Sequence, residues 1–436
     1  MGGISVHVFT LTAVVIGFAA SLASAQCNTT SVSESQQCSF EDGFFHSNLT
    51  FGNTSVETCN TRILKYASSW ISTALDNLTI HLVCQALNNE IFTEEKLQML
   101  LSDLRQIMES TLNLYYILSN NQSQSDVIDV LGVLNTLTAD NLHNVDFIKL
   151  WFYIKIKPLL AFVSKEFMLN LSGKNWSCAT YQTIVKGFSD EFPNMEKMKQ
   201  KMVYDHFISV FLTRNDTSDP GCVSDTKGTV DWLKLNYGEY SAYAALEDFL
   251  KINRNFSALD VLDSLSPDQK AQLILDPSTG TLENETIVKL VFSSLLESPE
   301  EGQLDAFFVA FVHATTEKNV TIIRNQAVRD IMLNLTLTAL APRFPIFEPD
   351  DFALWFQTNL VVLLASFTPD SLVVIPRNIS CDSYRAILKG LEESLASLQP
   401  AETQGIESSK EVLMEGAPKS CKLDSNQDGN HQKLQL

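Results

Sequence analysis

Residues 175–187 read N-W-S-C-A-T-Y-Q-T-I-V-K-G, and residues 378–390 read N-I-S-C-D-S-Y-R-A-I-L-K-G. Seven of the thirteen positions are identical. In the first copy Tyr181 and Ile184 follow Cys178 at steps of three residues, a spacing that places the three side chains along one face of an α-helix. The glycine that closes each copy either allows close helix packing or ends the helix in the left-handed conformation. The stretch therefore predicts a helix that begins at a cysteine and occurs twice.

Two further landmarks recur in the same order. Leu150–Phe152 and Leu159–Ala161 precede the first copy, and they return as Leu354–Phe356 and Leu363–Ala365 before the second copy. The offsets are 204, 204 and 203 residues for the three pairs of landmarks. Three motifs in order and in register predict an internal repeat of about 204 residues.

The cysteine that follows each copy stands at a similar distance. Cys222 lies 44 residues after Cys178, and Cys421 lies 40 residues after Cys381. This spacing predicts one disulfide within each module, and closing a loop of that length contributes about 4 kcal/mol in the chain-entropy model. We interpret the repeated stretch as a disulfide staple with a packing face, with a binding epitope as the alternative.

The hydrophobic pattern predicts an all-α chain of short amphipathic helices. Apolar residues recur at three- and four-residue steps over residues 63–82 and 97–118 and again at Leu304, Phe307, Phe308, Phe311 and Val312. Ser266–Gln269 (S-P-D-Q) and Ser298–Glu301 (S-P-E-E) have the capping-box pattern that opens a helix. Ser371–Ile375 is the best candidate for a strand, and it is short. A superhelical, α-solenoid-like stack is the favoured architecture, with a pair of compact helical bundles as the alternative.

The chain divides into five predicted segments. These are a signal peptide (1–25), an N-terminal glycosylated lead-in and helical segment with four cysteines (26–145), a complete helical module (146–345), a second, truncated module (346–421) and a disordered polar tail (422–436).

Three features predict export from the cell. An apolar run, Val8–Ala20, precedes the A-x-A cleavage site Ala23–Ala25, so the mature chain is expected to begin at Gln26. The eight cysteines lack the C-x-x-C spacing of metal sites, and the pairing of Cys27, Cys38, Cys59 and Cys84 stays open. Thirteen N-x-[S/T] sequons are candidate N-glycosylation sites: Asn28, Asn48, Asn53, Asn77, Asn121, Asn170, Asn175, Asn215, Asn255, Asn284, Asn319, Asn334 and Asn378.

No pattern in the sequence predicts a catalytic, cofactor or metal site. The net charge of −20 and the lack of a Lys/Arg-rich patch argue against nucleic-acid binding. His206, His313 and the pair Asp350–Asp351 are interpreted as structural residues, the last pair as the first turn of a helix. Asp424–Gly429 matches the opening of a calcium loop, but Gln435 stands where the bidentate carboxylate belongs. We expect no membrane span in the mature chain and no lipid anchor, because no apolar run follows Cys421.

Two short pieces resemble a known family. Leu265–Gln269 reads L-S-P-D-Q ahead of spaced leucines, and Glu415–Pro418 reads E-G-A-P. With the L-x-x-L series they resemble the mesothelin, stereocilin and otoancorin group. The resemblance implies an extracellular glycoprotein of superhelical helix repeats that acts in cell adhesion or attachment to acellular gels. Because the chain has no basic R-x-[K/R]-R processing site and no GPI-type tail, neither surface anchoring nor any functional residue is carried over.

The sequence therefore favours a secreted, extracellular, heavily N-glycosylated protein that is not an enzyme. Its partner is expected to be an extracellular protein or glycan, met through a helical-repeat surface. Two alternatives stay open: a secreted enzyme or enzyme inhibitor with an unrecognised site, and a soluble carrier of a lipid or another small molecule.

Overall fold

The structure is a computed structural model in which residues 133–134 and 137–421 are described. The predicted signal peptide, nearly all of segment 26–145 with its four cysteines and helical stripes, and the polar tail lie outside these residues. Within the described residues every regular element is a helix and none is a strand, which confirms the all-α class. No helix in this part of the chain is long and apolar enough to cross a membrane.

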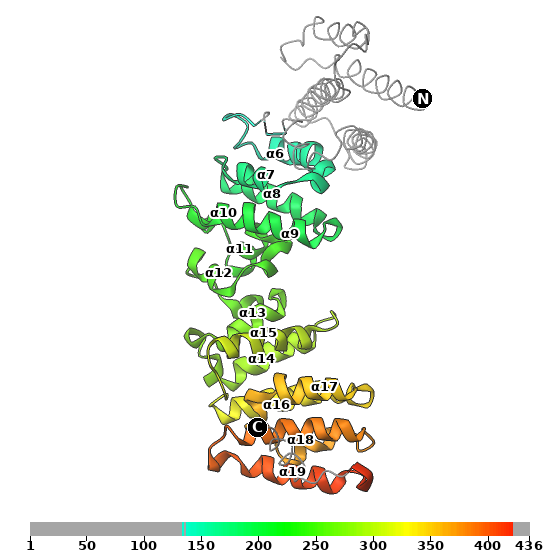
Figure 1. Cartoon of the computed structure of the whole chain (residues 1–436). Coiled ribbons are helices and arrows are strands. Elements are labelled where there is room, and N and C mark those ends of the chain that lie inside the picture. Colours follow the sequence, from blue (N-terminus) through cyan, green and yellow to red (C-terminus); the bar gives the residue numbers. More distant parts are fainter. Residues whose placement is uncertain (1–132, 135–136, 422–436) are drawn as a thin grey trace, which may run out of the picture. The chain divides into compact units, whose positions relative to one another are not determined.

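The described helices cluster into two compact units that divide near residue 245 (Figure 1). This division falls inside the predicted module 146–345, and the predicted module boundaries stay predictions. Helix α12 (Leu246–Ile252) contributes residues to both units.

Unit 1 consists of α-helices joined by 3-10 and π-helical turns. Its elements are α6 (Val145–Trp151), η1 (Phe152–Ile156), η2 (Lys157–Phe162), α7 (Lys165–Ser172), α8 (Cys178–Glu191), η3 (Phe192–Asn194), α9 (Lys197–Val203), η4 (Tyr204–Ile208), α10 (Ser209–Leu212), η5 (Pro220–Cys222), α11 (Thr229–Asn236) and η6 (Gly238–Tyr243).

Unit 2 has longer helices. Its elements are η7 (Ala258–Ser264), α13 (Pro267–Leu275), η8 (Pro277–Thr279), η9 (Thr281–Glu283), α14 (Glu285–Leu296), α15 (Gln303–Glu317), α16 (Gln326–Leu340), η10 (Phe344–Ile346), α17 (Pro349–Leu354), η11 (Trp355–Asn359), η12 (Val361–Ser366), η13 (Pro369–Val374), α18 (Cys381–Leu395), η14 (Pro400–Glu402), α19 (Gln404–Gly416) and η15 (Lys419–Cys421).

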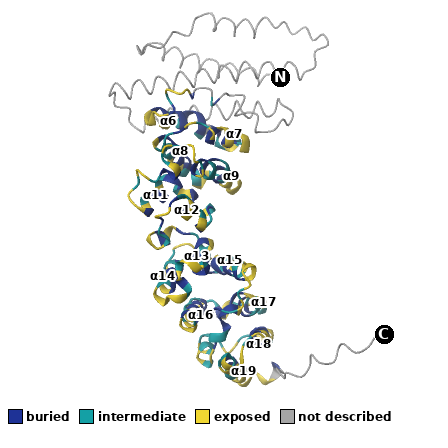
Figure 2. Ribbon diagram, turned by 90° about the vertical axis from the view of Figure 1, so that its left-hand side faces the viewer, coloured by how far each residue is buried: buried dark blue, intermediate teal, exposed yellow. Residues whose placement is uncertain are grey.

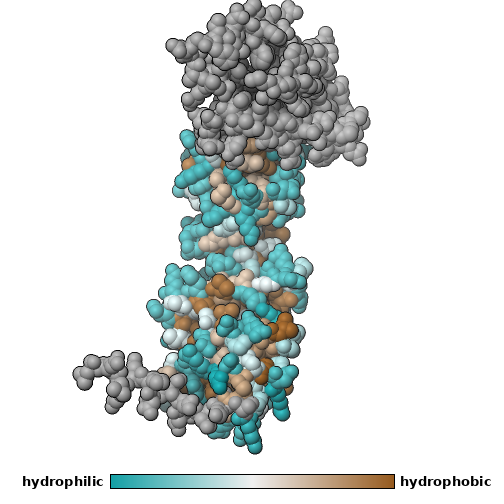
Figure 3. Space-filling view, turned by 45° about the vertical axis from the view of Figure 1, so that its right-hand side comes forward, coloured by the Kyte–Doolittle hydropathy of each residue, from teal (hydrophilic) through white to brown (hydrophobic). Residues whose placement is uncertain are grey.

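Amphipathic helices build the core of each unit, and most of them carry both buried and exposed residues (Figure 2). In unit 2 the predicted stripe of α15 is buried at Leu304, Phe307, Phe308 and Phe311, whereas Val312 is half-buried. Phe308 packs edge-to-face on Trp355 with 5.1 Å between ring centroids. Each such ring contributes about 1.5–3 kcal/mol through removal of apolar surface from water. The outer surface in Figure 3 is mainly hydrophilic with scattered hydrophobic residues.

One of the two predicted capping boxes is confirmed. Ser266 Oγ accepts a hydrogen bond from the Gln269 backbone N–H at 3.2 Å, and Gln269 Oε1 accepts from the Ser266 N–H at 3.0 Å. The prediction at Ser298 is wrong, because α15 begins only at Gln303. Gly302 precedes that helix with φ +78°, a left-handed conformation that a continuing helix does not adopt.

The predicted strand at Ser371–Ile375 is also wrong. The segment forms the 3-10 helix η13, which begins at Pro369. Thr368 is its N-cap residue, and Ser371 Oγ accepts from the Thr368 backbone N–H at 3.2 Å, as in a capping box. A proline at the first helical position has its φ already set for a helix, so the local cap outweighs the β-branched composition of the segment.

Candidate functional site

The repeated stretch forms the first part of α8 and of α18. Ser177 Oγ accepts from the Thr180 N–H at 3.3 Å, and Ser380 Oγ accepts from the Ser383 N–H at 3.1 Å. Each helix thus begins at the cysteine that follows its capping serine, as the sequence predicts.

The predicted face of each helix points into the protein. Tyr181 and Ile184 on α8 are buried, as are Tyr384 and Ile387 on α18. Tyr181 also stacks on Phe211 with centroids 4.1 Å apart. Burial raises the pKa of the Tyr181 phenol well above its usual value, since the charged form would be desolvated. The repeated tyrosine is therefore a packing residue and stays protonated at neutral pH.

The repeated glycine allows close helix packing, which is the first of the two expected roles. Gly187 lies inside α8, and a Cβ there would stand 2.6 Å from Cδ1 of Phe152. Gly390 lies inside α18, and a Cβ there would stand 2.5 Å from the backbone oxygen of Phe356. Neither glycine ends its helix. Each lies against the phenylalanine of the repeated Leu-Trp-Phe motif.

The same order of elements precedes both stapled helices. In unit 1 the α-helix α6 runs into the π-helix η1 and then the 3-10 helix η2; in unit 2 α17 runs into the π-helix η11 and then the 3-10 helix η12. Both π-helical segments contain the phenylalanine of the repeated motif, Phe152 or Phe356. These π-helices were not predicted from the sequence. The recurrence of the Leu-Trp-Phe motif is a signal that could have marked both segments, since π-helices are rare and occur mostly as single turns inside α-helices.

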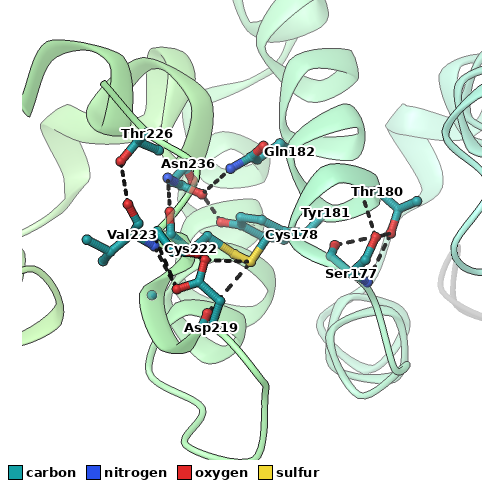
Figure 4. The surroundings of a disulfide bond; sticks show 12 residues. Ser177, Cys178, Thr180, Tyr181, Gln182, Asp219, Cys222, Val223, Thr226 and Asn236 are labelled. Carbon is teal, nitrogen blue, oxygen red and sulfur yellow. Dashed lines mark hydrogen bonds between the residues drawn. A yellow bond between two sulfur atoms is a disulfide. The ribbon is translucent and has the colours of Figure 1, made fainter. Parts of the chain in front are cut away.

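The first staple joins Cys178 to Cys222 with 5.5 Å between Cα atoms (Figure 4). Cys178 Sγ lies 3.7 Å from the backbone oxygen of Asp219 and 3.8 Å from its Oδ2. Both sulfurs belong to the disulfide and carry no hydrogen, so this is a carboxylate approaching a sulfur and not a hydrogen bond. Trp232 Nε1 donates to the Gly221 oxygen at 2.9 Å, and Asn236 Nδ2 donates to the Cys222 oxygen at 3.4 Å. The backbone around Cys222 is therefore held by α11 as well as by the disulfide.

The second staple joins Cys381 to Cys421 with 5.1 Å between Cα atoms. Arg385 donates through Nη2 to the Cys421 oxygen at 2.9 Å and through Nη1 to Asp382 Oδ1 at 2.6 Å. The Tyr384 hydroxyl donates to the Arg377 oxygen at 2.8 Å. Both intramodule disulfides predicted from the cysteine spacing are thus present, and they differ in the charges beside them.

All the described sequon asparagines are exposed. The predicted sites Asn28, Asn48, Asn53, Asn77 and Asn121 lie outside the described residues. The eight exposed ones are Asn170, Asn175, Asn215, Asn255, Asn284, Asn319, Asn334 and Asn378.

The residues weighed for chemistry do not come together. His313 is exposed on α15, His206 is half-buried on η4, and Asp350–Asp351 form the first turn of α17 as expected. Among the described residues no three His, Cys, Asp or Glu side chains are grouped so that they could hold a metal ion. Neither observation assigns a catalytic role to any side chain.

The resemblance drawn from Leu265–Gln269 and Glu415–Pro418 stays a prediction. No family model matches the chain, and no curated protein or solved structure matches it either.

Proposed function

We propose that the chain is a secreted, N-glycosylated, non-enzymatic protein that binds an extracellular protein or glycan through the surface of a helical-repeat stack. A role in cell adhesion or contact with the matrix follows from the resemblance to the mesothelin group. The observation that carries the proposal is the exposure of every described sequon asparagine.

Asparagine is not uniformly exposed in this chain. Outside the sequons, Asn236, Asn253 and Asn359 are buried, Asn141 and Asn325 are half-buried, and Asn144 and Asn194 are exposed. An attached glycan is bulky and hydrophilic and must stay in water. All eight described sequon asparagines are exposed, against two of the seven other described ones, and this difference supports use of the sites.

One sequon asparagine also has a structural role that a glycan would leave intact. Asn284 caps α14, because its Oδ1 accepts from the Thr286 N–H at 3.0 Å and the Ile287 N–H at 3.3 Å. The sugar is attached through Nδ2, so the capping oxygen stays available.

In unit 1 the sequons gather at one end of the helices. Arg214, next to Asn215, donates through Nη1 to the backbone oxygens of Ser172 and Lys174 at 2.9 and 3.0 Å, which brings it close to Asn170 and Asn175. The disulfide Cys178–Cys222 ties this end to Gly221, the neighbour of Cys222. A Cβ at Gly221 would stand 2.5 Å from the side chain of Ile252, and Asn255 follows Ile252 by three residues.

Other side-chain contacts of unit 1 lie away from this end, and none of the described residues that make them is a sequon asparagine. Lys199 Nζ donates to the Val163 oxygen at 2.7 Å, Lys157 pairs with Glu191 at 2.6 Å, and the Tyr243 hydroxyl donates to Gln200 Oε1 at 2.8 Å. Under the proposal, glycans cover the sequon end of unit 1, and a protein partner reaches the sequon-free end.

The finer architecture belongs to the same proposal. The repeated α–π–3-10 order and the matching glycine contacts of Phe152 and Phe356 support an internal repeat of about 204 residues. A stack in which each helix pair buries its apolar face against the next one would make the chain α-solenoid-like.

Glycosylation is tested by secretion from cultured human cells, enzymatic deglycosylation in heavy-oxygen water, and peptide mass spectrometry. We expect the protein in the medium and heavy-oxygen-labelled aspartate at most of the eight described sequons. Protein that stays in the cytosol or carries no label would contradict the proposal.

Binding is tested with labelled, glycosylated protein on epithelial cells and on basement-membrane extract. Glu196→Asn with Met198→Thr creates a sequon at the sequon-free end of unit 1, where both residues are exposed. Asp225→Asn with Lys227→Thr creates one in the exposed loop after Cys222 and serves as the matched control. We expect saturable binding that the first pair weakens and the second pair preserves. Absence of saturable binding on both probes would refute the adhesion role.

A further inference from the structure

The two disulfides differ in the charges that surround them. The sulfur of Cys178 has the Asp219 carboxylate 3.8 Å away. At the second staple, Arg385 contacts the carbonyl of Cys421 and shares its charge with Asp382. The first staple thus has an anion beside its sulfur, and the second has a largely neutralised ion pair.

This difference matters for reaction with thiols. A disulfide is broken by a thiolate that attacks one of its sulfurs. A carboxylate about 4 Å from the attacked sulfur repels an anionic thiol that approaches this sulfur. Two unit charges about 4 Å apart interact by about 1 kcal/mol in a water-like dielectric, which corresponds to about fivefold in rate. Cys178 and Cys381 are both half-buried, whereas Cys222 and Cys421 are buried, so attack is directed at the first cysteine of each pair.

We propose that Cys381 is a thiol-reactive modification site, where an anionic low-molecular-weight thiol such as glutathione opens Cys381–Cys421, whereas Asp219 shields Cys178–Cys222. The thiolate sulfur attacks Cys381 Sγ and forms a mixed disulfide, and the electron pair of the broken S–S bond leaves on Cys421 Sγ as a thiolate. A second thiolate then attacks the mixed disulfide, which yields oxidised thiol and the Cys381 thiolate.

The consequences of opening also differ. After reduction of the first staple, Trp232 and Asn236 still hold the backbone oxygens of Gly221 and Cys222. After reduction of the second staple, the Arg385 guanidinium still donates a hydrogen bond to the backbone oxygen of Cys421. Opening at Cys381 therefore loosens the segment that follows α19, while unit 1 keeps its local structure. This inference does not depend on the proposed function.

The experiment follows partial reduction of the oxidised full-length protein. Glutathione is added at low ionic strength, samples are quenched with acid and alkylated, and mass spectrometry measures free and glutathione-bound cysteine in each pair. We expect Cys381–Cys421 to open about five times faster than Cys178–Cys222, with glutathione attached at Cys381. The preference should shrink with cysteamine, a cationic thiol, and at high salt, which screens the charges.

Two variants separate charge from loosening of the structure. Asp219→Asn keeps an oxygen that can accept from the Val223 and Ser224 N–H groups but removes the charge. It should speed opening of Cys178–Cys222 by glutathione about fivefold and change the cysteamine rate little. Asp225→Asn, an exposed residue of the same loop, is the matched control and should leave both rates unchanged.

Three results would overturn the inference. The first is opening of Cys178–Cys222 by glutathione as fast as, or faster than, Cys381–Cys421. The second is an equal gain with glutathione and cysteamine in Asp219→Asn, which would show local loosening and no charge effect. The third is glutathione attached at Cys421 and absent from Cys381.

Discussion

The repeated glycines are the positions where the structure predicts the sharpest difference between two similar substitutions. A Cβ at Gly390 would stand 2.5 Å from the oxygen and 2.7 Å from the carbonyl carbon of Phe356, and backbone atoms in a π-helix cannot move away independently. A Cβ at Gly187 would instead meet the ring of Phe152 at 2.6 Å, which can shift by rotation. The ring is buried and packs on Phe188 at 4.9 Å, so its freedom is limited.

The magnitudes follow from two opposing effects. Overpacking a core lowers the free energy of unfolding by about 1–3 kcal/mol. Replacing a mid-helix glycine by alanine raises it by about 1 kcal/mol, because alanine has the higher helix propensity. Gly390→Ala lies at the upper end of the overpacking range, so we expect a net loss of about 2 kcal/mol of unfolding free energy. Gly187→Ala should lose about 1 kcal/mol or less. Gly416→Ala is the matched control, since a Cβ there meets nothing within 4 Å, and it should be neutral or slightly stabilising.

The assay is thermal and urea unfolding of each variant with its disulfides intact, together with amide hydrogen exchange along α8 and α18. A loss of 1 kcal/mol corresponds to about 2–4 °C for units of this size. Gly390→Ala should lower the unfolding temperature of unit 2 and speed exchange in α18, while α8 is unaffected. An unchanged transition in Gly390→Ala, or a larger loss in Gly187→Ala, would refute the packing argument.

Three further predictions concern a helix cap, a buried cation and a buried phenol. Asn284→Gln and Thr286→Ala both remove one sequon, but only Asn284→Gln also removes the α14 cap; it alone should lower the unfolding free energy, by about 1 kcal/mol in urea titration. Arg329→Met should lower the unfolding free energy by about 1–3 kcal/mol in the same titration, because the buried guanidinium donates to a backbone oxygen at 2.7 Å. Arg343→Met breaks a half-exposed ion pair and should lower it by less than about 1 kcal/mol. Equal losses in the two variants would contradict this ranking. Burial raises the pKa of Tyr240, so the protonated phenol favours folding, and stability should be intact below pH ~10 and fall as pH rises further, as followed by circular dichroism.

Local interactions explain which features could be predicted from the sequence. The capping box at Ser266 and the apolar stripe of α15 depend on residues three or four apart, so the chain itself carries the signal. The helix start predicted at Ser298 was wrong for a local reason as well, because Gly302, in a left-handed conformation, immediately precedes the first residue of α15. At Ser371 the preceding proline and threonine outweighed strand propensity.

The sequence by itself determined the all-α class, the first residue of each stapled helix and the partner of each stapled cysteine. The cysteine partners could be assigned because a second cysteine follows each copy of the repeated stretch at a similar separation, 44 residues for Cys178 and 40 for Cys381. Only the tertiary structure decided that the repeated glycines face phenylalanines of π-helices, and that Asp219 lies beside a disulfide sulfur. These contacts join residues about 35–40 positions apart, and which atoms meet at that distance depends on how whole helices pack, which no short sequence pattern specifies.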